Sequence, residues 1–265
     1  MEAAVRLNEI TQVYVTERGA SLAIEEINLS LEPGEFVGLV GPSGCGKTTL
    51  LSIIAGLIRP TSGTVQIFGE TVESPSGKVG YMLQQDYLFP WRTIYQNVLV
   101  GLELTGQLTK ANREYALHLL NELGLADTKD QYPSQLSGGM RQRVALVRTL
   151  VTEPDILLLD EPFSALDYQT KLELEDLLSA TLKARGKTAL LVTHDISEAV
   201  AMSDRVLVMG RNPGILRKEI IIPEPIRHET PFKAREAAEF HPIFNQIWRE
   251  LETQERKSGV NDANR

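Results

Sequence analysis

The stretch GPSGCGKTT, residues 41–49, constrains this chain more than any other. It follows the apolar run FVGLV and leads into TTLLSIIAGL, so a buried strand would pass through a glycine-rich turn into a helix. The stretch also fits the whole pattern G-x-x-x-x-G-K-[ST], whose backbone N–H groups and helix N-terminus surround phosphate oxygens. A chance glycine-rich turn explains this setting less well. The sequence therefore predicts a phosphate-binding loop made of Gly41, Pro42, Ser43, Gly44, Cys45, Gly46, Lys47, Thr48 and Thr49.

Three side chains of this stretch carry specific expectations. Lys47 is expected to reach the β- and γ-phosphates of a nucleotide, and the Thr48 hydroxyl is expected to bind Mg²⁺. Cys45 is the single cysteine of the 265 residues, so no disulfide can form within the chain, which fits a reducing compartment. Cys45 serves either as a small residue whose backbone matters or as a redox switch, and the sequence favours the first interpretation.

Four short runs are apolar at every position, which is typical of strands buried on both faces of a mostly parallel sheet. They cover residues 36–40, 156–159, 189–192 and 206–209. Helical patterns separate them: one repeats leucines over 168–185 and stops at Gly186, and another begins after Asp195, which forms a capping-box pattern with Glu198. The pattern predicts an α/β fold with a mainly parallel central sheet and the active loops at the carboxyl ends of its strands.

Other parts of the chain do not follow this alternation of buried strands and helices. Residues 93–152 show helices without a convincing strand, which indicates an inserted helical subdomain. Val65 and Ile67 alternate with polar residues before Gly69, which indicates a small antiparallel N-terminal sheet. After Met209, prolines up to Pro242 divide the tail into short pieces, and the last eight residues are expected to fray. We predict an ATPase-type domain over 1–220, with the helical subdomain at approximately 86–152, and a partly helical tail over 221–265 whose end is disordered.

Two adjacent acids close the strand run ILLLDEP, residues 156–162. Asp160 is placed to hold Mg²⁺, and Glu161 is placed to polarise the attacking water, because paired acids at a strand end are costly to desolvate without a cation or a reaction. The alternative is a solvated loop. His194 ends the next strand run in the same way, so we expect it to contact the γ-phosphate, although a lone histidine is usually structural.

A second anion-binding pattern lies in QLSGGMRQR, residues 135–143. Ser137, Gly138 and Gly139 precede a helical run, and a helix N-terminus attracts anions. This stretch has no lysine, so the site does not look self-sufficient. The alternative is that the serine and glycines simply cap a helix near the surface.

Taken together, these motifs resemble those of the ATP-binding cassette (ABC) ATPases over approximately residues 5–209. Leu136 to Met140 resembles the family's LSGGQ signature with Met in its last place, and SALD, residues 164–167, resembles its D-loop. The resemblance assigns Gln84, or its neighbour Gln85, as the Q-loop glutamine near Mg²⁺, and His194 as the switch histidine. Tyr14 falls where the family stacks an aromatic ring on adenine.

The resemblance implies a function for the second phosphate pattern. Two copies would pack head to tail, with each ATP between the phosphate-binding loop of one copy and Ser137–Gly139 of the other. Lys47, Mg²⁺ and the loop amides would neutralise the transferring phosphoryl group while Glu161 orients water. The helical insertion would receive short cytoplasmic helices of a membrane partner, so the nucleotide state would move that partner.

Composition excludes several other functions. The net charge of −8 argues against a nucleic-acid or anionic-membrane surface. The N-terminus has no secretory signal pattern, and no apolar run reaches the roughly 18 residues of a membrane span. A membrane part would therefore come from another chain. One cassette without sustained heptads argues against the ABC machines of translation and DNA repair. A P-loop kinase or GTPase would leave the SGGM and SALD motifs unexplained, and the intact motif residues argue against a scaffold without turnover.

Within the family, LFPWRTIYQNV, residues 88–98, resembles the importer ATPases for nitrate, sulfonate and taurine. NPGIL, residues 212–216, and the tail EFHPIFNQIWREL resemble the same group, although NPGIL departs from its pattern at two places. Trp91 is then either a core aromatic or a contact with the permease. The implied partners are a second ATPase copy, identical or related, an integral membrane permease and, indirectly, an extracytoplasmic solute-binding protein. The implied location is the cytoplasmic face of the cell (inner) membrane, as a peripheral subunit.

Overall fold

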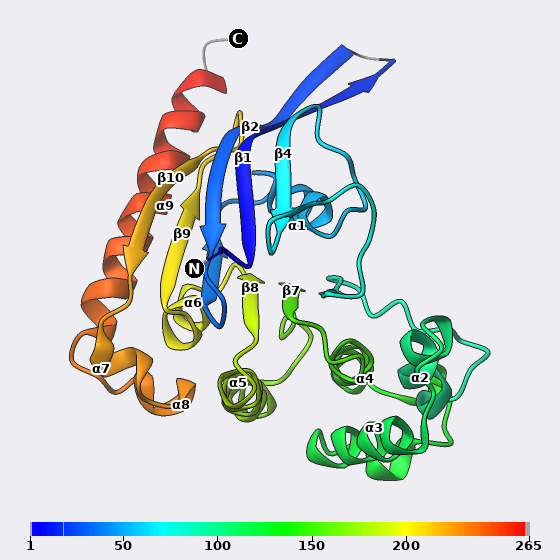
Figure 1. The fold of residues 1–265 in the computed structure, drawn as a ribbon. Coiled ribbons are helices and arrows are strands. Elements are labelled where there is room, and N and C mark those ends of the chain that lie inside the picture. Colours follow the sequence, from blue (N-terminus) through cyan, green and yellow to red (C-terminus); the bar gives the residue numbers. More distant parts are fainter. Residues whose placement is uncertain (1, 18, 263–265) are drawn as a thin grey trace. The chain divides into compact units, whose positions relative to one another are not determined.

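A computed structural model describes residues 2–17 and 19–262 (Figure 1). The chain divides into two compact units. The first unit comprises Met1–Ser76 and Glu175–Arg265, and the second comprises Gly77–Leu174. Helix α5 (Tyr168–Ala184) begins in the second unit and continues into the first. None of the helices in the described part of the chain is long and apolar enough to cross a membrane.

The first unit begins with an antiparallel sheet whose strand order is β2-β1-β4-β5. Its strands are β1 (Val5–Thr16), β2 (Gly19–Leu31), β4 (Ser62–Ile67) and β5 (Glu70–Thr71). The small antiparallel sheet predicted from the alternation before Gly69 is therefore confirmed, but most of its length comes from β1 and β2. Those two strands lacked a clear alternation because register shifts interrupt their pairing between Leu7 and Val13.

The same unit holds strands in the order β10-β9-β3-β8. They are β3 (Phe36–Val40), β8 (Thr188–Val192), β9 (Arg205–Met209) and β10 (Leu216–Ile221). Strand β3 is parallel to both β8 and β9, and every residue of β3 and β8 is buried, as the all-apolar runs predict. Because β3 and β8 are parallel, their carboxyl ends lie at one edge. Strand β10, which the sequence did not indicate, pairs antiparallel with β9.

Helices cover this sheet in the first unit. They are α1 (Lys47–Ile54), α6 (Ile196–Met202), α7 (Glu224–Arg227), α8 (Pro231–Ala234) and α9 (Phe240–Asp262). Asp195 caps α6 by accepting from the Ser197 and Glu198 amides, at 2.8 Å and 3.3 Å. The Glu198 carboxylate instead accepts from the Thr193 hydroxyl at 3.0 Å. The N-cap prediction is therefore confirmed, with Thr193 rather than Asp195 facing the glutamate.

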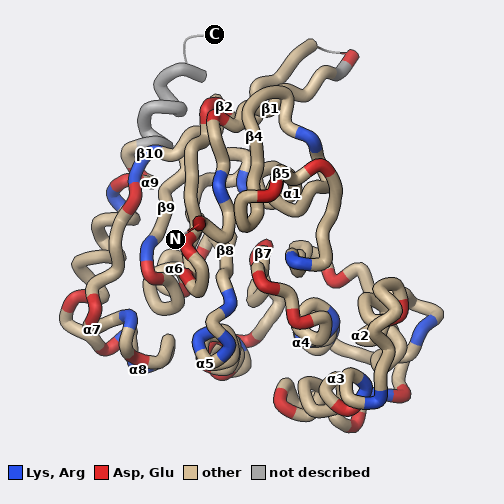
Figure 2. The backbone as a smooth tube through the Cα atoms, in the orientation of Figure 1, with Lys and Arg blue, Asp and Glu red and all other residues tan. Residues whose placement is uncertain are grey.

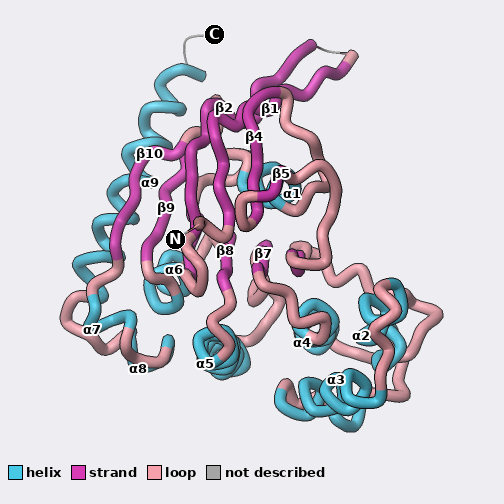
Figure 3. The backbone as a smooth tube through the Cα atoms, viewed as in Figure 1, coloured by secondary structure: helices cyan, strands magenta, loops and turns pink. Residues whose placement is uncertain are grey.

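The tail differs from the series of short pieces that its prolines predicted. Helices α7 and α8 are short, but α9 runs for 23 residues and lies beside β9 and β10 (Figures 1 and 3). Pro242 lies in the first turn of α9, where a missing N–H group costs no hydrogen bond. Phe240 and Ile247 are buried in a cluster with Ile196 and Val200 of α6. The last three residues of the end expected to fray lie outside the described part of the chain.

The second unit contains the parallel strands β6 (Val79–Met82) and β7 (Ile156–Asp160) and a set of helices. The helices are α2 (Ile94–Leu104), α3 (Lys110–Glu122) and α4 (Gly138–Leu150), with short 3₁₀ turns at Ala126–Thr128 and Pro133–Gln135. They fall within the range predicted to be a helical insertion, while the domain boundaries stay predictions. Figure 2 shows acidic and basic positions interspersed along α5, whereas the charged residues of α4 are all arginines.

Candidate functional site

The loop from Gly41 to Gly46 connects β3 to α1 as the motif predicts. Gly44 and Gly46 have φ values of +76° and +99°, a region that side chains rarely adopt. A Cβ atom on Gly46 would also collide with Ile24 of β2. Gly46 caps α1 without any side-chain hydrogen bond to the helix amides. This geometry fits an anion, because the loop can turn its N–H groups inward at a helix N-terminus.

Lys47 folds back over this loop. Its Nζ atom donates to the Gly41 oxygen at 2.7 Å and to the Pro42 oxygen at 3.1 Å, and it lies 3.7 Å from the Cys45 sulfur. One ammonium therefore holds the first half of the loop. A compact cation at this position fits phosphate oxygens as well as carbonyl oxygens.

Cys45 is expected to be chemically inert in the folded protein. Its side chain is fully buried, and this burial raises the pKa of the thiol although the Lys47 ammonium opposes the rise. A raised pKa lowers the fraction of thiolate, the reactive form, at any pH below it. We expect iodoacetamide at neutral pH to modify the native chain at least about tenfold more slowly than the guanidine-unfolded chain. Equal rates in the two states would support the redox-switch interpretation instead.

Two residues predicted to bind nucleotide meet beside the loop. The Tyr14 hydroxyl of β1 lies 3.3 Å from the Thr49 hydroxyl of α1, and Tyr14 is 38% exposed. The side chains of Ser43 and Thr48 are exposed. An exposed aromatic ring and exposed hydroxyl-bearing residues in the loop and at the start of α1 are of the kinds that contact a base and phosphates.

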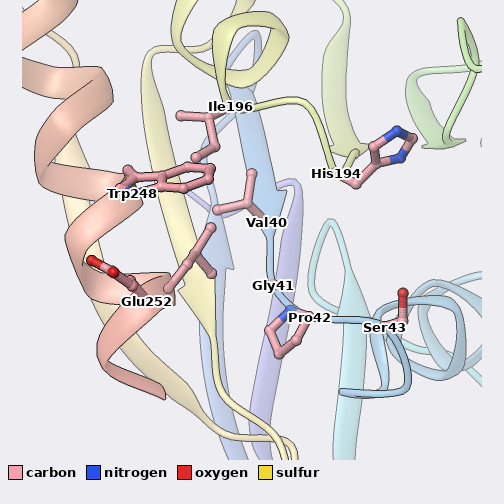
Figure 4. Close-up of a pocket in the computed structure, with 9 residues that line it drawn as sticks. Val40, Gly41, Pro42, Ser43, His194, Ile196, Trp248 and Glu252 are labelled. Carbon is pink, nitrogen blue, oxygen red and sulfur yellow. The ribbon is translucent and has the colours of Figure 1, made fainter. Parts of the chain in front are cut away.

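A pocket of about 280 Å³ adjoins the outer side of the loop. Its lining residues are Val40, Gly41, Pro42, Ser43, His194, Ile196, Trp248, Leu251 and Glu252 (Figure 4). The indole of Trp248, from α9, faces Ile196 and Val40, whereas the His194 imidazole points away from the indole. The structure thus brings His194 to the edge that holds the loop, as parallel β3 and β8 require. The sequence did not indicate that α9 lines this pocket, because that contact depends on how the tail packs in three dimensions.

Asp160 and Glu161 follow β7 in the second unit. Asp160 is the last residue of the strand and is 2% exposed. Glu161 has a φ of +51°, a strained value for a side chain with a Cβ atom. Its Oε2 atom accepts from Gln84 Nε2 at 3.1 Å. The structure therefore brings together Gln84 and Glu161, and it selects Gln84 over Gln85 as the residue that contacts the acid.

Ser137 caps α4, as the alternative interpretation of the SGGM stretch expects. The Ser137 hydroxyl accepts from the Met140 amide at 3.3 Å. Gly138 and Gly139 form the first turn, and a Cβ atom on Gly139 would lie 3.1 Å from Leu166. A pocket of about 360 Å³ in the same unit is lined by Gln84, Gln85, Asp86, Tyr87, Gly138, Arg141, Gln142 and Ala165. A capped helix start beside an open pocket remains compatible with an anion from outside the unit.

Gln142 is a residue that the sequence interpretation did not select. It lies on α4, is 5% exposed, and its amide contacts the loop that follows β7. Burial of a glutamine among Ala145, Leu146 and Thr149, at spacings of three, four and seven residues, was the available signal. A polar side chain on the apolar face of a helix needs hydrogen-bond partners, which points to a specific contact.

The residues predicted to bind Mg²⁺ offer only a few oxygen ligands. Thr48 offers a hydroxyl in the first unit, and Asp160 offers a carboxylate in the second. Among the side chains that the structure describes, no three His, Cys, Asp or Glu groups gather into a potential metal cluster. Mg²⁺ commonly uses one or two protein oxygens and takes its other ligands from water and phosphates. The residues present therefore fit a metal that arrives with a nucleotide.

Comparison with known proteins adds independent observations. The ABC transporter family matches residues 24–164. An uncharacterized ABC transporter ATP-binding protein of Bacillus subtilis is 49% identical over 96% of this chain and 97% of its own length. A nitrate import ATP-binding protein of Synechocystis is 41% identical over 92% of this chain and 93% of its own. A taurine import ATP-binding protein of Ruegeria pomeroyi is 40% identical over 83% of each chain.

A solved structure agrees with these sequence matches. It is the dimer of an ATP-binding cassette in a post-hydrolysis state, bound to ADP and Pi. Its TM-score is 0.75 at 32% identity, and the match covers 83% of this chain and 99% of the solved chain. The α/β fold predicted from the buried strands and the phosphate-binding loop is therefore confirmed as that of a P-loop cassette.

Proposed function

Since this chain belongs to the ABC transporter family and is an ATP-binding subunit with ATPase activity, we propose that it powers an importer for a small solute. The solute would be nitrate, a sulfonate, taurine or a related organic compound. The observation that carries this proposal is the 41% identity with a nitrate import ATP-binding protein over nearly both chains. The segment LFPWRTIYQNV supports the same assignment.

In the proposed reaction, the loop amides and Lys47 bind the β- and γ-phosphates, and Tyr14 stacks on the base. The Thr48 hydroxyl and Asp160 carboxylate would hold Mg²⁺, with Gln84 close by. The metal supplies charge neutralisation on the phosphate oxygens when it is bound. Lys47 adds its own positive charge, which lowers the barrier as negative charge spreads over the transferring group.

Glu161 accepts a hydrogen bond from the attacking water and orients it for in-line attack on the γ-phosphorus. The contact with Gln84 holds its carboxylate before the reaction. His194 contacts the γ-phosphate from the switch position after β8.

We propose that two copies complete each other's sites. Ser137, Gly138 and Gly139 of one copy would contact the ATP held by the loop of the other, because a capped helix N-terminus offers a dipole and amides but has no lysine of the kind that Lys47 supplies in the loop. The dimeric arrangement of the solved relative supports this pairing. ATP would hold the head-to-tail pair together, and hydrolysis would release it.

The proposed partner is an integral membrane permease that receives solute from an extracytoplasmic binding protein. The subunit would then lie at the cytoplasmic face of the cell membrane as a peripheral protein. Affinity purification from gently solubilised native membranes, followed by mass spectrometry, tests this directly. A polytopic membrane protein in stoichiometric amount is the expected companion. Recovery of soluble companions alone, after crosslinking, would overturn the importer assignment.

Trp91 is expected to contact the permease. The indole is 71% exposed, which removes the core-aromatic interpretation, and its ring centroid lies 5.3 Å from that of Phe89. Exposed tryptophans in interfaces contribute about 2 kcal/mol or more, so Trp91→Ala is expected to weaken permease binding at least about tenfold. The melting temperature should change by less than about 2 °C.

The matched control for Trp91 is Leu104→Ala. Leu104 is 83% exposed in the same unit, at the end of α2. Binding to permease in detergent, measured by surface plasmon resonance, should fall for the first variant and not for the second. Unchanged binding of Trp91→Ala would contradict the assignment of this surface.

A further inference from the structure

Both the nitrogen and the oxygen of the Gln142 side-chain amide form hydrogen bonds inside the second unit. Its Nε2 group donates to the Glu161 carbonyl oxygen at 3.0 Å and lies 3.4 Å from the Ser164 hydroxyl. Its Oε1 atom accepts from the Ala165 amide at 2.9 Å. One buried side chain therefore contacts both ends of the turn from residue 161 to residue 165.

This turn needs restraint because of the backbone of Glu161. Glu161 has a φ of +51°, which is strained for a non-glycine residue and persists only where its surroundings hold it in place. The Glu161 carbonyl accepts from Gln142 and also from the Ser164 hydroxyl at 3.1 Å. Of these two donors, Gln142 is 5% exposed, whereas Ser164 is exposed. Water therefore competes less for the hydrogen bond that the buried Gln142 amide donates.

Restraint of the Glu161 backbone also fixes the direction in which the Glu161 side chain projects from the main chain. The φ and ψ angles of Glu161 decide where its Cα–Cβ bond points. Gln84 then holds the far end of the same side chain at Oε2. Gln142 and Gln84 thus fix Glu161 at its backbone and at its carboxylate, respectively.

We infer that Gln142 is a positioning residue for ATP hydrolysis, which acts through Glu161 by holding its strained backbone in place. This inference rests on the proposed role of Glu161. It adds a residue on α4, the helix that Ser137 caps, outside the strand end that carries the two acids. Loss of the Gln142 amide would let the Glu161 backbone relax toward ordinary φ and ψ angles. The Glu161 carboxylate would then move away from the position where it orients the attacking water.

The test replaces Gln142 by Met, which keeps the length and volume of the side chain but removes its hydrogen bonds. We expect kcat for ATP to fall by about 10- to 100-fold, as for a misplaced reacting group, with KM for ATP changed less than about threefold. Gln169→Met is the matched control, because Gln169 is an exposed glutamine on α5 whose Nε2 group donates to the Glu173 carboxylate at 3.1 Å. It should leave kcat unchanged.

A double-variant cycle separates positioning from stability. In the Glu161→Gln background, Gln142→Met should not lower the residual single-turnover rate further, because the group that it positions is already gone. An equal fold-loss in both backgrounds would overturn the inference, as would a lower melting temperature with kcat unchanged well below it. Should Gln142→Met not fold, Gln142→Asn keeps the polar groups one methylene short and must show the same loss of kcat.

The same cycle distinguishes this inference from the role of Glu161 itself. Wild-type turnover by Glu161→Gln would mean that the proposed base is wrong. Loss of turnover in Glu161→Gln together with normal kcat in Gln142→Met would leave the base in place and refute only the positioning role.

Discussion

Glu161→Gln is expected to bind ATP, accumulate as an ATP-bound dimer and lose nearly all turnover. The amide keeps the size of the carboxylate and its contact with Gln84 in one orientation, but it cannot accept a proton from the attacking water. Positioned acid–base groups contribute about 10²- to 10⁴-fold, so kcat should fall within or beyond that range. Steady-state phosphate release and size-exclusion chromatography with ATP measure the two effects.

The matched control for this variant is Glu173→Gln. Glu173 is an exposed glutamate of the same unit that accepts from Gln169 at 3.1 Å. Its replacement should leave both turnover and association unchanged. Turnover of Glu161→Gln at the wild-type rate would show that another residue activates the water. Loss of ATP binding would instead show that the substitution has damaged the fold or the pocket.

Lys47→Met is expected to lose both ATP binding and turnover. Removal of one preorganised positive group from a developing charge costs about 10²- to 10³-fold in rate. Binding should weaken as well, since Lys47 meets phosphates in the ground state in the proposed complex. The loop also loses the bonds from Nζ to the Gly41 and Pro42 oxygens, so the Gly41–Gly46 segment should become more mobile without nucleotide.

Calorimetric titration with ATP and phosphate release measure these losses for Lys47→Met. Lys110→Met serves as the control, because Lys110 is an exposed lysine at the start of α3 whose ammonium lies 3.8 Å from Glu114. Glu161→Gln and Lys47→Met should differ in kind, since the first keeps ATP binding whereas the second loses it. A Lys47→Met chain with wild-type affinity would place the phosphates elsewhere.

Much of the fold could be predicted because its signals are local. The four all-apolar runs correspond to β3, β7, β8 and β9, and the helix predicted to stop at Gly186 ends two residues before that glycine. Strand β10 and the long strands β1 and β2 escaped prediction. Their residues are only partly buried, and register shifts disturb the alternation that marks a strand.

The tail shows where a local rule fails. The prolines of the tail, including Pro242, predicted a series of short segments. Helix α9 nevertheless starts at Phe240 and accommodates Pro242 in its first turn. A proline interrupts a helix only where its N–H group would be needed. Burial of Phe240 and Ile247 against α6 favours the helix, and this packing is not visible in the tail alone.

Features that lie within contiguous residues could be predicted from the sequence. The loop from Gly41 to Lys47, the acids at the end of β7 and the cap at Ser137 each need only neighbours in the chain, because backbone amides, helix ends and strand ends are local features. Which distant side chains meet these features became apparent from the packing of the folded units. Gln142 contacts Glu161 across 19 residues and Tyr14 contacts Thr49 across 35. Such contacts depend on how helices and strands pack, and that packing minimises the free energy of a whole unit rather than of any single segment.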